Sequence, residues 1–337
     1  MRRSTREFSI VMMGLALMSG CYAGYEKAAA SYAAAVKRSS QELTAEFDLA
    51  LSICQQRNRV YLFQKRLTAE PPAWGHDGYL ADELTRLRAP DYKPAQDEQD
   101  CEDIVKVSAL HHKALRALAA YAHALQALAD SDAIFGDSIK DTIDDAAKLA
   151  LALSGNAKTT PVTQFATALA SPLDELAKLT AGAWAKHKLK EQIAEADGPI
   201  AKLVDALKQY VGITDAQVRS LESVQTGVLQ TLEQQMADRA SSSPKASAPI
   251  FGAISVAELY NLGVQWDSEV RNMRAAQSSY AAVLDRLKAA HSDLGKAGKR
   301  DRDELKALVQ KVGNDLYTVY SESTKLRKAL SALGGAS

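Results

Sequence analysis

Six histidines are the residues of this chain whose type and position raise the question of catalysis or metal binding. His111 and His291 each fall on the apolar stripe of a predicted helix, where a single histidine is usually a hydrogen-bonded core residue. His111 and His112 are adjacent, so they point to different faces of one helix. His112 and His123 are three helical turns apart, about 16 Å, which is too far for two ligands of one metal ion. We therefore expect no metal site from the histidines.

The carboxylates gather in two places, Asp97–Asp103 and Asp137–Asp145. Asp141, Asp144 and Asp145 could offer oxygen ligands to a hard cation, but they lack the glycine and the spacing of a calcium loop. Acidic clusters are common at helix starts, where the helix dipole favours negative charge. The chain also has no G-x-S-x-G elbow, phosphate-binding loop or dinucleotide-binding glycine pattern. We predict no catalytic, cofactor-binding or metal site, and hence a protein that is not an enzyme.

Residues 1–21 have the layout of an export signal peptide. Three arginines precede an apolar run of about a dozen residues, and Ser19 and Gly20 come directly before Cys21. The run is too short to span a bilayer as a helix, which takes roughly 20 apolar residues. Its ending resembles the lipobox of bacterial lipoproteins. The resemblance implies cleavage before Cys21, with lipid, including a palmitate-type acyl chain, on its sulfur and its new amino terminus. The alternative is an ordinary cleaved signal, or a signal anchor, with an incidental cysteine.

The resemblance also implies a location. Lipoproteins of this type carry two or three acyl chains, and each buried methylene contributes about 0.8 kcal/mol to membrane attachment. In enterobacteria an aspartate after the lipidated cysteine retains the protein in the inner membrane, whereas this chain has Tyr22. The resemblance therefore implies the outer membrane of a Gram-negative cell envelope, with the protein facing the periplasm. In a Gram-positive cell the anchor would lie on the outer face of the cell membrane.

With Cys21 assigned to lipid, the other two cysteines are Cys54 and Cys101. Each falls on an apolar helical stripe, and two thiols in an exported chain are a candidate disulfide. A bridge requires that the two Cα atoms come within about 7 Å. The alternative is two buried, reduced cysteines, which are common core residues. Neither has a second cysteine or a histidine at ligand spacing, so a metal site is not expected.

Composition points to an all-α protein. Alanine is abundant, aromatic residues make up 6% of the chain, and alternating runs of Val, Ile and Thr are absent. Of the 337 residues, three arginines and one glutamate lie within residues 1–20, so the mature chain carries 38 basic and 40 acidic residues. This balance favours neither a nucleic-acid binder nor a polybasic membrane binder.

The first third of the mature chain predicts a long helical hairpin over residues 21–130. Its first helix runs from about Tyr25 to Thr68, and its second starts near Asp97. Residues 69–97, rich in proline and glycine, form the joint and contain a short helix over Tyr79–Arg88.

Residues 131–240 predict a middle layer of shorter helices, inserted in the bundle or at its end. Thr160 and Pro161 look like a cap and a first-turn proline. Ser171-Pro172 predicts a restart or a kink, and a helix carrying Leu173 and Leu189 is expected to end at Gly198-Pro199. Residues 199–240 predict two helices, because Gly212 breaks the pattern and Thr214–Gln217 is a capping box.

Residues 241–250 form the clearest linker, and residues 251–337 carry the cleanest helical pattern. Two stripes with steps of three and four, opened by capping pairs at Ser255 and Asp301, predict an antiparallel helical hairpin. We expect it to pack on residues 21–130, which gives an elongated antiparallel helical bundle with long, coiled-coil-like helices. Two separate bundles joined at residues 241–249 are the alternative.

These observations predict a non-enzymatic, membrane-anchored lipoprotein whose bundle binds a protein partner or acts as an envelope scaffold or spacer. Only residues 22–24 separate the anchor from the first predicted helix, so the bundle should lie close to the membrane. Three alternatives stay open: an immunity or inhibitor lipoprotein against a secreted toxin, an oligomeric envelope component whose stripes complete a coiled coil, and an enzyme with a site in the irregular middle. The sequence does not identify the partner.

Overall fold

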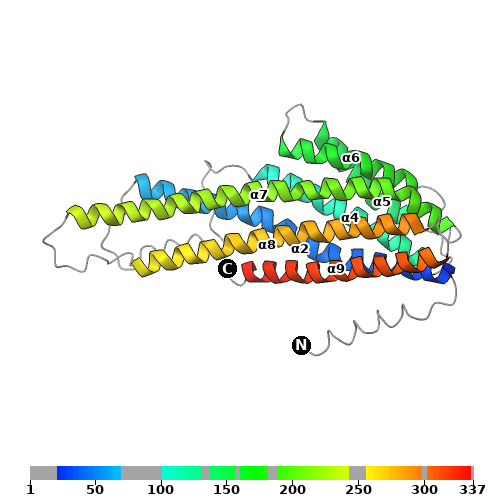
Figure 1. Ribbon diagram of the computed structural model, residues 1–337. Helices are drawn as coiled ribbons and strands as arrows, with labels where there is room; N and C mark the ends of the chain where they lie inside the picture. Colours follow the sequence, from blue (N-terminus) through cyan, green and yellow to red (C-terminus); the bar gives the residue numbers. More distant parts are fainter. Residues whose placement is uncertain are drawn as a thin grey trace. The chain divides into compact units, whose positions relative to one another are not determined.

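A computed structural model describes residues 21–69, 101–130, 137–155, 160–180, 188–242, 256–297 and 302–334 (Figure 1). Over these ranges the chain is a helical bundle without strands, so the predicted all-α class is confirmed. None of the described helices is both long enough and apolar enough to cross a membrane. The helices are α2 (Cys21–Ala69), α4 (Glu102–Asp130), α5 (Asp137–Ser154), α6 (Pro161–Thr180), α7 (Leu189–Ser242), α8 (Val256–Ala297) and α9 (Arg302–Gly334).

The helices divide into two compact units, each built from segments far apart in the sequence. Unit 1 combines the chain up to Thr44 with Ala109–Tyr210 and Ser279–Thr324, and unit 2 combines Ala45–Ser108 with Val211–Ser278 and the chain from Lys325 on. Helices α2, α4, α7, α8 and α9 each contribute a segment to both units. This division differs from the expected one, because residues 131–240 are not a layer of their own. They are shared between the two units.

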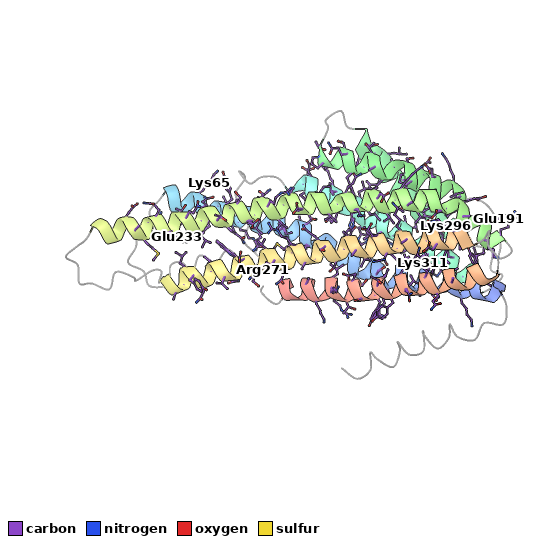
Figure 2. All side chains as sticks on the ribbon, in the orientation of Figure 1. Lys65, Glu191, Glu233, Arg271, Lys296 and Lys311 are labelled. Atoms are coloured by element: carbon purple, nitrogen blue, oxygen red, sulfur yellow. A yellow bond between two sulfur atoms is a disulfide. The ribbon has the colours of Figure 1, made fainter. Side chains whose placement is uncertain are left out.

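In unit 1 a hydrogen bond joins the first helix to the C-terminal hairpin. The Tyr25 hydroxyl donates a hydrogen bond of 3.2 Å to the carbonyl of Leu294, which joins α2 to α8. Helices α8 and α9 run antiparallel, with ion pairs of 3.1 Å between Arg286 and Asp315 and 2.8 Å between Lys311 and Asp293 (Figure 2). These pairs fix the register of the hairpin.

In unit 2 polar bonds join α2 to both α7 and α8. The Gln235 amide donates to the carbonyl of Leu67 over 2.9 Å, and the Gln56 amide donates to the Glu269 carboxylate over 2.9 Å. Many other charged side chains project outward, among them the exposed Lys65, Glu233 and Arg271 that Figure 2 labels. The unit therefore has the polar outside and apolar inside of an amphipathic helix bundle.

Helix α7 corrects the predicted breaks. It continues through Gly198, Pro199 and Gly212 as one helix of 54 residues. A proline inside a helix costs about 3 kcal/mol. Here it is outweighed because the following apolar residues are buried, each contributing about 1.5–3 kcal/mol; they include Ile200, Leu203, Val204 and Leu207.

Thr214 lies inside α7 and does not cap a new helix. Its hydroxyl donates to the carbonyl of Val211 over 3.0 Å and accepts a 3.0 Å bond from the buried Gln277 amide of α8. Both bonds occupy the oxygen that a capping box would use. The predicted pair of helices over residues 199–240 is therefore wrong, and the cause is a tertiary partner.

Other predicted boundaries have mixed outcomes. The Thr160 hydroxyl accepts from the backbone NH of Thr163 at 3.3 Å, so the cap before Pro161 is confirmed. Helix α6 continues across Pro172, and Leu173 and Leu189 belong to different helices, α6 and α7. The short helix expected over Tyr79–Arg88 and most of the expected linker lie outside the described residues.

Candidate functional site

Cys21 is the first residue of α2, and the structure describes its backbone but not its side chain. The signal-peptide residues 1–20 lie outside the described residues, so cleavage and lipidation remain predictions. The expected three-residue tether, Tyr22 to Gly24, belongs to α2. Tyr25, in the first turn, is completely buried. Any group attached to Cys21 would therefore lie at the first residue of a helix that is packed into the bundle from Tyr25.

Cys54 and Cys101 form a disulfide in the structure, with their Cα atoms 6.1 Å apart. The bond joins the middle of α2 to the residue before α4, across 47 positions of the chain. Closing a loop of that length restricts the unfolded chain and stabilises the fold by about 4 kcal/mol. Of the two states that the sequence allows, the structure contains the bridged one.

Two polar side chains lie against the sulfur atoms. The Nη2 of Arg57 is 3.6 Å from the Sγ of Cys54, and the Nδ2 of Asn58 is 3.5 Å from the Sγ of Cys101. Both side chains are more than nine-tenths buried. The disulfide of unit 2 therefore has polar neighbours, although sequence periodicity placed both cysteines on apolar stripes.

The two stripe histidines are buried in unit 1, and each bonds a tyrosine of another helix. The Nε2 of His111 on α4 is hydrogen-bonded to the hydroxyl of Tyr280 on α8, with 2.5 Å between the two atoms. The hydroxyl of Tyr121 on α4 meets the Nε2 of His291 on α8 at 2.7 Å. The helices thus exchange roles, each supplying one histidine and one tyrosine. The spacings, ten residues on α4 and eleven on α8, place the pairs about 15 Å apart along parallel helices.

The His291 pair is completed by a carboxylate. The Nδ1 of His291 is 3.3 Å from the Oδ1 of Asp197 on α7, and Ser292 donates to the other oxygen over 3.4 Å. The tautomer follows from these partners: Nδ1–H donates to the carboxylate, and Nε2 accepts from the Tyr121 hydroxyl. Both ring nitrogens are therefore hydrogen-bonded, Nδ1 to the Asp197 carboxylate and Nε2 to the Tyr121 phenol.

Burial keeps this histidine neutral. Desolvation lowers the pKa of His291, and the hydrogen bond to Asp197 opposes that effect. The bond from His291 in turn lowers the pKa of Asp197, against the effect of burial. Desolvation raises the pKa of Tyr121 well above its ordinary value, and the nearby Tyr32 adds to it. His291 and Tyr121 expose no surface, so neither of these hydrogen-bonded side chains reaches solvent.

The His111 pair lacks a carboxylate. Its imidazole stacks on the Tyr210 ring, with centroids 4.0 Å apart and planes 9° from parallel, and its Nδ1 has no hydrogen-bond partner. Burial lowers the pKa of His111 to about 3, with a further contribution from His112. His111 therefore acts as a neutral, largely aromatic core residue, whereas His291 is fully hydrogen-bonded.

The partners of these histidines were missed by sequence reasoning. Asp197 lies beside the Gly-Pro pair that was taken as a helix end, and nothing local marks it as the partner of a histidine. A signal did exist for the tyrosines, because the His111–Tyr121 and Tyr280–His291 spacings nearly match in reversed order. That match becomes informative only when α4 and α8 are known to be parallel neighbours.

The remaining candidate ligands are apart from these sites. His112 is half-buried and His123 is exposed, while Asp141 and Asp145 lie on the exposed face of α5. In the part of the chain that the structure describes, no three His, Cys, Asp or Glu residues come together as ligands of a metal ion.

Comparison with known proteins identifies no relative. No protein-family model matches the chain, and neither a curated protein nor a solved structure matches it. The functional argument therefore depends on the sequence and on this structure.

Proposed function

We propose that the protein is a lipoprotein of the bacterial cell envelope, anchored through Cys21, whose helical bundle binds a protein partner or holds one at a fixed distance from the membrane. The observation that carries the proposal is the Ser19-Gly20-Cys21 ending of the export signal. The outer membrane, with the bundle in the periplasm, is the location that Tyr22 supports by resemblance.

Two features of the helices agree with an anchor at this position. Helix α2 begins at Cys21, and its first turn is docked through the buried Tyr25, which bonds the carbonyl of Leu294. An acyl group on Cys21 would therefore be held at the end of a packed helix. The Cys54–Cys101 disulfide also agrees with export, since disulfides persist in oxidising compartments such as the periplasm.

A partner-binding role is supported by apolar side chains left on the surface of unit 2. Tyr260 and Val264 are one turn apart on α8 and are 71% and 47% exposed, and Tyr61 of α2 is 40% exposed. Aromatic residues are enriched at the centres of protein interfaces. These three side chains are the first positions to test for partner binding.

The anchor is tested by labelling cells that express the full chain with a palmitate analogue. We expect label and membrane fractionation for the wild type, and loss of both for Cys21→Ala. Cys101→Ala is the matched control, because it removes a cysteine elsewhere and should keep the label. A Cys21→Ala chain that stays with the membrane through a detergent-sensitive attachment would contradict the proposal.

A further inference from the structure

The disulfide has an unusual neighbour, because Arg57 is a buried cation whose partners are all uncharged. Its guanidinium donates to the side-chain Oδ1 of Asn58 at 2.9 Å, the side-chain Oε1 of Gln217 at 3.1 Å and the Sγ of Cys54 at 3.6 Å. Among the described residues no carboxylate pairs with it. A buried charge normally requires an opposite charge, since desolvation is costly.

The sulfur beside Arg57 is a latent anion. Reduction of the disulfide would give Cys54 a thiol, and a cation at hydrogen-bond distance stabilises the thiolate. Arginine stays protonated at any physiological pH, so its charge is always present. Within the described part of the chain Arg57 has no anionic partner in the oxidised protein, and the Cys54 thiolate would supply one after S–S cleavage.

The two sulfur atoms differ in access. Cys54 is 1% exposed, whereas Cys101 is half-buried and lies directly before α4. The carbonyl of Cys101 accepts from the backbone NH of Val105 over 2.9 Å, so Cys101 occupies the N-cap position of α4. A reagent from solvent therefore meets Cys101 first, and the helix dipole favours negative charge there too.

We propose that Cys54 and Cys101 form a thiol–disulfide exchange site, in which the thiolate of an external dithiol attacks Cys101 and Cys54 leaves as a thiolate stabilised by Arg57. The first step forms a bond between the external sulfur and Cys101 and breaks the Cys54–Cys101 bond, whose electron pair stays on Cys54. The second thiol of the reagent then loses its proton and attacks the mixed disulfide. It releases Cys101 and leaves the reagent oxidised by two electrons.

The environment favours this direction of cleavage. A sulfur whose thiol has a low pKa leaves faster, and the guanidinium of Arg57 beside Cys54 favours its thiolate. Of the acidic residues beside Cys101 in sequence, Asp100 lies outside the described residues, whereas Glu102 and Asp103 are exposed and Glu102 is paired with Lys106 at 2.6 Å. The Glu269 carboxylate of α8 accepts from the Gln56 and Gln265 amides, so it is already hydrogen-bonded.

The first experiment measures the acidity of Cys54 in the full chain. In a Cys21→Ser, Cys101→Ser background Cys54 is the single thiol, and its thiolate is followed by ultraviolet absorbance as the pH changes. We expect an acid dissociation constant at least about tenfold above that of an ordinary thiol, whose pKa is about 8.5. Burial alone raises the pKa of a thiol, so a pKa at or above the ordinary value would overturn the proposal.

Matched variants separate charge from packing in the same background. Arg57→Gln should raise the pKa of Cys54 and abolish most of the tenfold increase in its acid dissociation constant. Arg57→Lys should preserve that increase. Arg59→Gln, two positions along the same helix, should leave it unchanged. An equal effect of Arg57→Gln and Arg59→Gln would show that Arg57 has only a general structural role.

The second experiment identifies the attacked sulfur in the Cys21→Ser chain with its disulfide intact. Brief exposure to glutathione, followed by acid quenching and peptide mass analysis, should place glutathione on Cys101. Glutathione on Cys54, or no adduct until the protein is unfolded with urea, would overturn the proposal. This measurement keeps Arg57 and needs no folded single-cysteine variant, so it decides the question even if the variants do not fold.

Discussion

The two buried histidines of unit 1 have the same kind of tyrosine partner but different second partners. His291 donates its single NH to Asp197, whereas the Nδ1 of His111 has no hydrogen-bond partner and its ring stacks on Tyr210. Replacing a buried side chain whose polar atoms are all hydrogen-bonded lowers stability strongly, because each lost bond removes a partner from another buried group. Replacing a side chain with an unbonded polar atom lowers stability less. The comparison therefore teaches that equal burial does not mean equal importance for stability.

The largest expected effect is for His291→Phe. The change removes the His291 acceptor of the Tyr121 hydroxyl and the His291 donor to the Oδ1 of Asp197, whose other oxygen keeps its bond from Ser292. Because Asp197 keeps a third of its side chain exposed, we expect a loss of about 3 kcal/mol and no more. Urea unfolding followed by circular dichroism measures it, with amide exchange of α4 and α8 reporting on unit 1. An equal loss for His111→Phe would break the comparison.

The second effect concerns pH. Burial lowers the pKa of His111 to about 3, from an ordinary 6.5, so between these values the unfolded chain binds a proton that the native state does not. The contribution of neutral His111 is complete above pH 6.5 and decreases as the pH falls, by about 2 kcal/mol at pH 5. We expect His111→Phe to lack this share of the acid destabilisation. The share from His291 has the same sign but is smaller, since Asp197 opposes the lowering of its pKa.

Urea unfolding of the wild type and of His111→Phe at a series of pH values between 3 and 6.5 checks this. Parallel curves for the two proteins would mean that His111 does not titrate differently in the folded and unfolded states.

The smallest effect is that of His111→Phe at neutral pH. Phenylalanine keeps an aromatic ring against Tyr210, and it removes the nitrogen that has no partner. Tyr280 keeps the carbonyl of Leu207, 3.5 Å from its hydroxyl. We expect a change within about 1 kcal/mol, because overpacking and the loss of one hydrogen bond are offset by the removal of an unsatisfied polar atom. A loss as large as that of His291→Phe would show that the Tyr280 bond alone carries the stability of this pair.

Much of the fold could be predicted from the sequence, because helix periodicity is a local property. The apolar stripes gave α2, α4, α8 and α9 to within a few residues, and the capping threonine at position 160 marked the start of α6. The failures lie at Pro199, Gly212 and Thr214. There the local signals for a break are real, but buried packing on other helices outweighs them.

The site was harder to predict, for the same reason. Both histidines were recognised as core residues from their stripes, but their partners Asp197, Tyr121 and Tyr280 come from other helices. The pairing depends on which helices are neighbours and on their direction, and neither quantity is encoded in a period of 3.6 residues.

The sequence by itself determined the all-α class and the buried faces of the long helices, and it predicts a lipidation signal at Cys21. Periodicity, propensity and a signal pattern each act within a short stretch of chain, so they can be read without a structure. Only the tertiary structure decided that α7 is continuous, that the chain forms two units from interleaved segments, and that Arg57 lies beside Cys54 with no carboxylate partner among the described residues. These features depend on side chains that are distant in sequence and meet in a packed core, where burial and unpaired charge set the energies.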